Sequence, residues 1–127
     1  WNAWVSGTNM QHALVLARKL LSRQKVATKQ IIMITDGEPT AHLEGGHVYF
    51  AYPPSYRTLE ETLKEVKRCT QEGITINTFM LESNYYLMDF VDKMTRLNKG
   101  RAFYTNPNEL GKYVMVDYLR NRRKRIA

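Results

Sequence analysis

The range Ile31–Ile34 is apolar throughout and ends at the turn signal Thr-Asp-Gly. An unbroken apolar run that stops at a turn is typical of a strand buried on both faces, as in a parallel sheet flanked by helices. Gly37 and Pro39 end this strand, so the pattern predicts Asp36 at the carboxyl end of a central strand. Ligands of open α/β sheets bind at that end. An isolated Asp-Gly pair, by contrast, favours a carboxylate that caps its own turn.

In four other segments, apolar residues recur at three- and four-residue spacing, which is the pattern of amphipathic helices. The inward stripe of the first helix includes Leu20, and that of the third includes Leu97. Gly73 ends the second helix, and Asn106 is the N-cap of a fourth helix that runs to about Arg120. The expected helices cover residues 9–22, 57–72, 84–98 and 107–120, and two more expected strands cover Ile74–Leu81 and Arg101–Thr105.

The alternation of strands and helices predicts one α/β domain over residues 1–127. Right-handed crossovers then give a three-layer, Rossmann-like parallel sheet with helices on both faces. The predicted strand order is Ile31–Ile34, Ile74–Leu81, Arg101–Thr105. Gly45-Gly46, between two short β-prone runs, predicts a β-hairpin insertion at about residues 41–53. The most hydrophobic strand would stand at a sheet edge, and we expect self-association through this exposed apolar edge.

The formal net charge of +7 is concentrated at the end of the chain. Five cations lie in a basic tail at residues 120–127, and the rest of the chain carries 14 basic and 12 acidic residues. A basic tail can contact nucleic acid or anionic lipid. Because no nucleic-acid reading module or aromatic stacking platform accompanies the charge, a solvated tail is favoured over nucleic-acid binding.

Cysteine content and hydropathy indicate a cytoplasmic protein without a membrane span. No apolar run approaches the roughly 18 residues that a membrane helix needs, and no positively charged start precedes an apolar segment. The single cysteine, Cys69, excludes an internal disulfide and fits a reducing compartment. It lies on the apolar stripe of its helix, where burial as a small hydrophobe is favoured over a nucleophilic role.

Two groups of residues carry candidate chemistry. Thr8 and Asn9 precede the first helix, and either side chain can supply the N-cap oxygen, while Thr8 can instead face a cation. His42, Glu44 and His47 contain zinc-ligand types, but their spacing matches no standard zinc signature. A hairpin without metal, with these side chains exposed, is the favoured interpretation. Because the hairpin is aromatic and lies near the same sheet edge as Asp36, a role in a partner-binding rim is the alternative.

The Ser-Gly-Thr-Asn segment at residues 6–9 and the Thr-Asp-Gly-Glu-Pro segment at residues 35–39 together resemble the von Willebrand factor A (VWA) family. The closer likeness is to bacterial intracellular members such as the carbon monoxide dehydrogenase accessory and magnesium-chelatase-like groups. The resemblance covers nearly all of this chain but only the later part of the family domain. The family's first motif, Asp-x-Ser-x-Ser, occurs nowhere in these 127 residues. The resemblance therefore implies an incomplete VWA fold that lacks its first strands.

The resemblance also implies a partial metal-ion-dependent adhesion site. In the family, such a Thr binds the cation directly and such an Asp often binds it through water, which are the roles implied for Thr8 and Asp36. Mg²⁺, or Mn²⁺ or Ca²⁺, would bind when the missing segment is present, and a carboxylate from a partner protein would complete the shell. The implied function is protein recognition, as an accessory protein working with an AAA-type ATPase. The expected periphery of the site comprises Ser6, Gly7, Asn9, Gly37 and Glu38.

Two alternatives use Asp36 differently. One is an Mg²⁺-dependent enzyme that binds a nucleotide or phosphate, and the other is a signalling domain in which Asp36 is phosphorylated. Neither GxGxxG nor GxxxxGK[ST] occurs in the chain, and the acidic pair and late lysine of a receiver-like domain are not evident. Metal-assisted hydrolysis needs a base near an activated water, and Glu38, beside Pro39, is better suited to a turn. The sequence therefore favours binding over catalysis.

Overall fold

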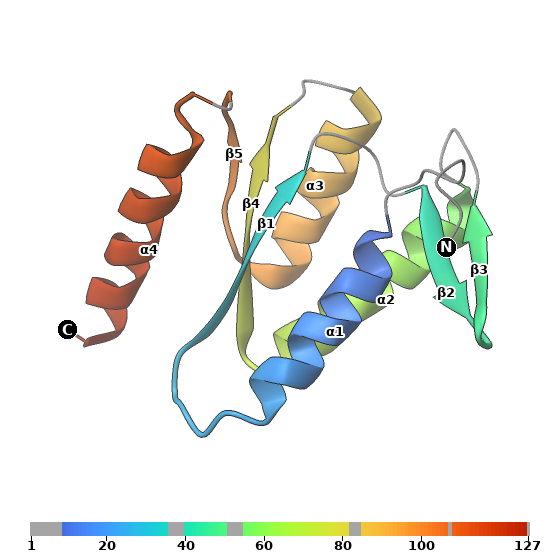
Figure 1. Ribbon diagram of the computed structural model, residues 1–127, viewed down its shortest axis with the longest axis horizontal. Coiled ribbons are helices and arrows are strands. Elements are labelled where there is room, and N and C mark those ends of the chain that lie inside the picture. Colours follow the sequence, from blue (N-terminus) through green and yellow to red (C-terminus); the bar gives the residue numbers. More distant parts are fainter. Residues whose placement is uncertain (1–8, 36–39, 51–54, 82–84, 107, 127) are drawn as a thin grey trace.

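The computed structural model describes residues 9–35, 40–50, 55–81, 85–106 and 108–126 (Figure 1). Its helices are α1 (Met10–Ser22), α2 (Tyr56–Gln71), α3 (Tyr85–Asn98) and α4 (Leu110–Ile126). Its strands are β1 (Lys29–Thr35), β2 (Ala41–Glu44), β3 (His47–Phe50), β4 (Ile74–Met80) and β5 (Ala102–Tyr104).

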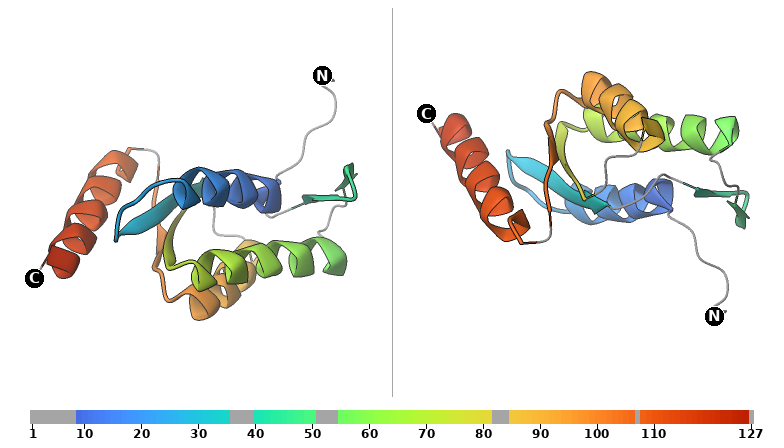
Figure 2. Two further views of the ribbon diagram at one scale, coloured as in Figure 1. Left: turned by 90° about the horizontal axis from the view of Figure 1, so that it is seen from below. Right: turned by 90° about the horizontal axis from the view of Figure 1, so that it is seen from above.

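Three strands form a parallel sheet in the order β1-β4-β5, which confirms the predicted fold class and strand order. Helices α1, α2 and α3 lie on one side of this sheet, and α4 lies on the other side (Figure 2). β2 and β3 form a separate antiparallel pair beyond the N-terminal ends of α1 and α2 (Figure 1). The protein is therefore a layered α/β domain with a hairpin at one side.

The central strand is β4, whereas the sequence pattern predicted the strand before Asp36 to be buried on both faces. Among the described residues β1 pairs only with β4, and Ile34 is 49% exposed. β4 has a neighbour on each edge, and Phe79 at its far end is completely buried. An apolar run therefore identified β1 as a strand correctly, but burial depends on how many neighbours the sheet order supplies.

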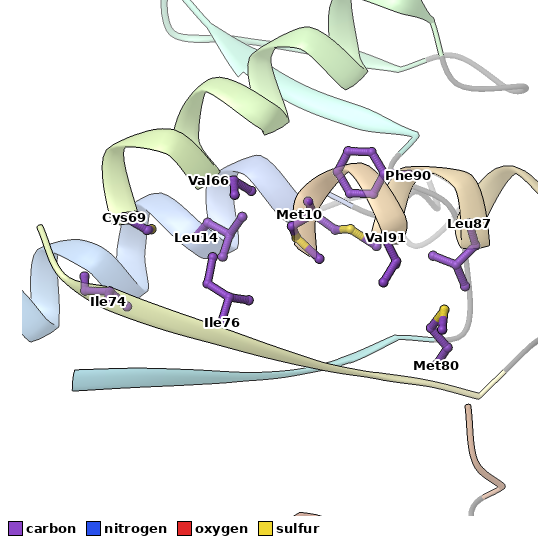
Figure 3. Packing of buried hydrophobic residues seen from close by; sticks show 11 residues of the cluster. Met10, Leu14, Val66, Cys69, Ile74, Ile76, Met80, Leu87, Phe90 and Val91 are labelled. Atoms are coloured by element: carbon purple, nitrogen blue, oxygen red, sulfur yellow. The ribbon is translucent and has the colours of Figure 1, made fainter. Parts of the chain in front are cut away.

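The hydrophobic core lies between β4 and the three helices on its face (Figure 3). Leu14 from α1, Val66 from α2 and Val91 from α3 lie on the side of β4 that carries Ile76 and Met80 and are almost wholly buried. Burial removes most of each side chain from water, which stabilises the fold by about 1.5–3 kcal/mol per residue. The other buried members of this cluster are Met10, Cys69, Ile74, Met80, Leu87, Phe90 and Met94.

Cys69 is completely buried in this core, as its place on the α2 stripe predicted. Desolvation by burial, and then the nearby Glu65 carboxylate, raise the pKa of its thiol to about 11. The thiol is therefore protonated at neutral pH and packs as a small apolar side chain.

Two helix predictions need correction. Leu20 is 64% exposed and Leu97 is 45% exposed, because each lies at the margin of its apolar stripe rather than at the centre that meets the sheet. α4 continues to Ile126 instead of ending near Arg120. Residues 121–126 contain no Gly or Pro, and the Arg and Lys residues among them have good helix propensity. Cations near a helix C-terminus also interact favourably with the helix dipole.

A buried asparagine joins three elements near the N-terminal end of β4. The side chain of Asn98 accepts a hydrogen bond from the Ile76 N–H at 2.6 Å. It donates to the Ile74 carbonyl and to the Thr70 hydroxyl, both at 2.9 Å. The end of α3 is thereby fixed to β4 and α2. The chain then passes close to β4 at Gly100, where a Cβ atom would lie 1.8 Å from the Ile76 carbonyl oxygen.

We predict that Gly100→Ala lowers the free energy of unfolding by about 3 kcal/mol, because backbone atoms of β4 would have to move to admit a methyl group. Gly111→Ala is the matched control, since a Cβ there meets nothing within 4 Å. It lies in α4, where alanine is favoured over glycine, so the control should be neutral or stabilising by up to about 1 kcal/mol. Urea unfolding of both variants measures the difference, and equal effects would contradict the close approach.

Candidate functional site

The carboxyl ends of the three parallel strands meet at one edge of the sheet. Thr35 is in register with Met80, and Met80 with Tyr104, so β1, β4 and β5 end together. Two backbone bonds continue the ladder at this edge, from the Leu81 N–H to the Thr35 carbonyl and from the Thr105 N–H to the Met80 carbonyl, each at 2.9 Å. Helices α1, α2 and α3 begin on this same side of the molecule (Figure 1). We call this region the carboxyl edge.

Most of the predicted site residues lie outside the described residues. This holds for both implied ligands, Thr8 and Asp36, and for the peripheral residues Ser6, Gly7, Gly37 and Glu38. Their neighbours in sequence are described: Asn9 directly precedes α1, and Thr35 ends β1 at the carboxyl edge. Through these neighbours the structure places the points from which both segments extend, and it describes no contact between them.

Asn9 is the N-cap of α1. Its side-chain oxygen accepts a hydrogen bond from the His12 N–H at 2.8 Å, and its carbonyl accepts from the Ala13 N–H at 3.2 Å. These bonds satisfy amides that would otherwise lack partners at the start of the helix. Of the two cap candidates that the sequence offered, the structure selects Asn9. The helix therefore does not require the Thr8 hydroxyl as its N-cap.

The β2–β3 hairpin is held against the N-terminal ends of two helices. Gly45 and Gly46, at φ +58° and +80°, form its turn, where residues with side chains would be strained. On the α1 side, the buried Gln11 accepts a hydrogen bond from the Leu43 N–H at 3.0 Å. On the α2 side, His42 and Thr58 are joined through a ring nitrogen and a hydroxyl 2.9 Å apart. The hairpin therefore connects α1 with α2 next to the carboxyl edge.

His42 is 2% exposed, which corrects the expectation that the hairpin histidine is exposed. Its Nδ1 atom faces the Thr58 hydroxyl, its Nε2 atom lies 3.1 Å from a Glu44 oxygen, and its ring stacks on Tyr49 with centroids 5.2 Å apart. Both ring nitrogens thus have protein partners. Sequence reasoning missed this because the partner hydroxyl is 16 residues away, and no local pattern links the two. The side chains of Val48 and Tyr49 remain exposed on the hairpin.

Glu44 is the charged member of this anchor. Its carboxylate accepts hydrogen bonds from Arg57 Nη2 at 2.5 Å and Nε at 3.2 Å, a paired geometry typical of arginine and carboxylate. The bond with Arg57, and then the bond with His42, lower the pKa of Glu44 from 4.5 to about 2. The same pairing raises the pKa of Arg57. The hairpin is thus attached to α2 by an ion pair that persists well below neutral pH.

A cation site at the carboxyl edge depends on oxygen ligands. Within the part of the chain that the structure describes, no group of three or more His, Cys, Asp or Glu side chains is arranged to hold a metal ion. The implied ligands in the sequence are a hydroxyl and a carboxylate, and hard cations such as Mg²⁺ and Ca²⁺ prefer oxygen donors. The donor chemistry of Thr8 and Asp36 therefore fits such a cation, although two side chains supply only part of an octahedral shell.

The parallel sheet, with helices on both faces and with strand ends and helix starts on one side, defines a Rossmann-like α/β domain. A family model described as "Rv0959-like protein, vWA domain" matches residues 1–119. The chain belongs to this vWA domain family. Membership of this family suggests that the chain is a protein-interaction module.

The similar proteins are mycobacterial. The chain is 40% identical over 123 residues to "Uncharacterized protein Rv0959" of Mycobacterium tuberculosis strain H37Rv and to "Uncharacterized protein Mb0984" of Mycobacterium bovis. The match covers 93% of this chain and 18% of each relative, so the chain spans less than a fifth of the length of the relatives it matches. No solved structure matches the chain. Among the described residues, no helix combines the length and apolar character needed to cross a bilayer.

The pKa of Glu44 gives a testable pH dependence. Because its folded-state pKa of about 2 lies below the ordinary 4.5, its contribution is complete above pH 4.5 and is lost as the pH falls toward 2. We predict that the Leu43 amide, measured by hydrogen exchange, loses protection across this range before the amides of β4 do. Glu44→Gln should remove this local transition, and Asp92→Asn, at an exposed position of α3 away from the Arg57 network, should keep it. Identical profiles in all three proteins would contradict the anchor.

Proposed function

We propose that this chain is the later part of a metal-dependent protein-interaction domain, with Thr8 and Asp36 as ligands of one cation. The observation that carries the proposal is the N-cap of α1: Asn9 fills that role, so the Thr8 hydroxyl is not needed for it. A hydroxyl ahead of a helix and a carboxylate after a parallel strand are oxygen donors suited to Mg²⁺, Mn²⁺ or Ca²⁺. The family membership supports the same assignment.

In this proposal the cation links two proteins. Thr8 binds it directly, Asp36 binds it through water, an upstream Asp-x-Ser-x-Ser segment supplies further oxygens, and a carboxylate of the partner fills a remaining position. The bound cation supplies a positive charge at the carboxyl edge that an acidic side chain can neutralise. The anchored hairpin, with Val48 and Tyr49 exposed, adds an apolar contact area beside that edge.

We further propose that the partner is a ring-forming ATPase of the AAA class and that this protein is its accessory. The support is the resemblance to the carbon monoxide dehydrogenase accessory and magnesium-chelatase-like groups, which share the Gly-Thr-Asn and Thr-Asp-Gly segments. A surface that binds through one cation and one partner carboxylate can be released when either is withdrawn. That property suits a partner that changes conformation during an ATP cycle.

Substitutions at residues 8 and 9 separate metal binding from helix capping. In a longer polypeptide that carries Asp-x-Ser-x-Ser ahead of Trp1, Thr8→Ala should lower Mg²⁺ affinity at least about tenfold and leave the thermal stability unchanged. Asn9→Ala should do the reverse, lowering the free energy of unfolding by about 1 kcal/mol with Mg²⁺ affinity within about twofold. Calorimetric titration and thermal melts measure the two effects.

Three further results test the proposal. The 127-residue chain alone should show no tight Mg²⁺ binding, because two side chains on separate segments provide too few ligands. Asp36→Asn should reduce Mg²⁺ affinity in the longer polypeptide. If Thr8→Asn retains full metal affinity with unchanged stability, Thr8 is not a ligand, and the proposed site loses one of its two residues.

A further inference from the structure

A groove of about 340 Å³ runs between α2 and α3. Its lining extends from Tyr56 to Lys67 on α2 and from Tyr86 to Leu97 on α3, which is about three turns of each helix. Leu59, Leu63 and Phe90 provide apolar surface inside it and also pack against or within the hydrophobic core. None of these residues belongs to the proposed metal site. We call this feature the α2–α3 groove.

The polar residues of the groove are ordered along its length. From the N-terminus of α2 the lining residues run tyrosine, glutamate, lysine, lysine (Tyr56, Glu60, Lys64, Lys67). On α3 the order is tyrosine, aspartate, lysine, leucine (Tyr86, Asp89, Lys93, Leu97). Both helices begin on the same side of the molecule, so the two series run in the same direction (Figure 1). One half of the groove is therefore aromatic and acidic, and the other half is basic.

The lysines remain available to a partner. Lys64 pairs with Glu60 and Glu61 at 3.5 and 3.3 Å, and Lys93 pairs with Asp89 at 3.1 Å, all within one helix and at the surface. Exposed pairs of this kind contribute little and can be exchanged for other carboxylates. Lys67 has no carboxylate within 4 Å among the described residues. The basic half of the groove thus has the capacity to attract an acidic segment.

The shape and chemistry of the groove suit a helix rather than a small molecule. In small-molecule sites a few buried polar groups point toward the ligand, whereas the charged groups here line the two helices on either side of the groove. An apolar channel between two helices, with exposed tyrosines at one end, matches the way an amphipathic helix inserts residues at i, i+3, i+4 and i+7 spacing.

We propose that the α2–α3 groove binds an amphipathic helix of a partner protein. Its aliphatic stripe packs on Leu63 and Phe90, and its carboxylates lie beside Lys64, Lys67 and Lys93. The end of the partner helix that carries no acidic residues lies between the two tyrosines, in the aromatic and acidic half of the groove, so the partner's carboxylates are kept away from Glu60 and Asp89. None of the groove residues is a proposed cation ligand, so binding in the groove requires no cation.

The test uses the 127-residue chain and two synthetic helical peptides of about 15 residues. Both carry leucines at i, i+4, i+7 and i+11, and they differ only in having glutamates or lysines beside the last two leucines. The glutamate peptide should bind, measured by fluorescence anisotropy at low salt, and replacing part of the NaCl by Mg²⁺ at constant ionic strength should have no effect. The double variant Lys67→Glu, Lys93→Glu should weaken this binding at least about tenfold and should bind the lysine peptide instead. Lys19→Glu, an exposed charge reversal on α1, is the matched control and should change affinity less than about twofold.

Several outcomes would overturn the proposal. These are equal binding of both peptides, equal effects of Lys19→Glu and the double variant, or no binding of the glutamate peptide to a chain that circular dichroism shows to be folded. Binding of anionic vesicles but not of the peptide would assign the lysines to a membrane surface instead. If sedimentation shows that the chain self-associates and the self-associated form no longer binds the peptide, the groove would be assigned to a second copy of this chain. A failed metal site leaves all these readouts unchanged, so the two proposals are tested separately.

Discussion

Burial of β4 is the constraint on which the other elements depend. The strand is paired on both edges, its Ile76 side packs against three helices, and its Phe79 side stacks on Phe103 at 5.1 Å. The backbone N–H and C=O groups of a strand enclosed in this way need hydrogen-bond partners, because an unpaired buried polar group costs free energy. The sheet register satisfies most of them, and two buried asparagine side chains complete the arrangement. Asn98 bonds the backbone of β4 from the end of α3, and Asn77 accepts from the Arg101 N–H at 3.0 Å just before β5.

The position of β4 in turn fixes the carboxyl edge. Because β1 and β5 are in parallel register with it, the chain leaves all three strands on one side of the molecule, and three helices begin there. The hairpin is then held at that side by Gln11 and by the His42–Thr58 contact. The proposed recognition site is therefore flanked by ordered elements at this edge. The exposed Ile34 on β1 is consistent with a neighbouring strand in the complete domain, and self-association through this edge stays a prediction.

The sequence predicted features that depend on local pattern. Apolar periodicity located the helices, and strand–helix alternation was enough for the strand order. Local sequence pattern did not predict the contacts between segments that are far apart in the chain. His42 looked like an exposed hairpin residue because its partner Thr58 belongs to another element. The choice between Thr8 and Asn9 as the cap needed backbone geometry, since both residue types cap helices well. The exposure of Leu97 depends on the position of α3 over the sheet, which periodicity does not specify.

The most direct test of the central claim, a cation at the carboxyl edge, is paramagnetic broadening by Mn²⁺ in the longer polypeptide that includes Asp-x-Ser-x-Ser. At substoichiometric Mn²⁺, we expect the amide signals of Asn9, Met10 and Thr35 to broaden first, since these residues adjoin the proposed ligands in sequence. Thr8→Ala should abolish this selectivity. Broadening centred on Glu60 and Glu61 of α2, or on Glu44 of the hairpin, with Asn9 and Thr35 unaffected, would contradict it.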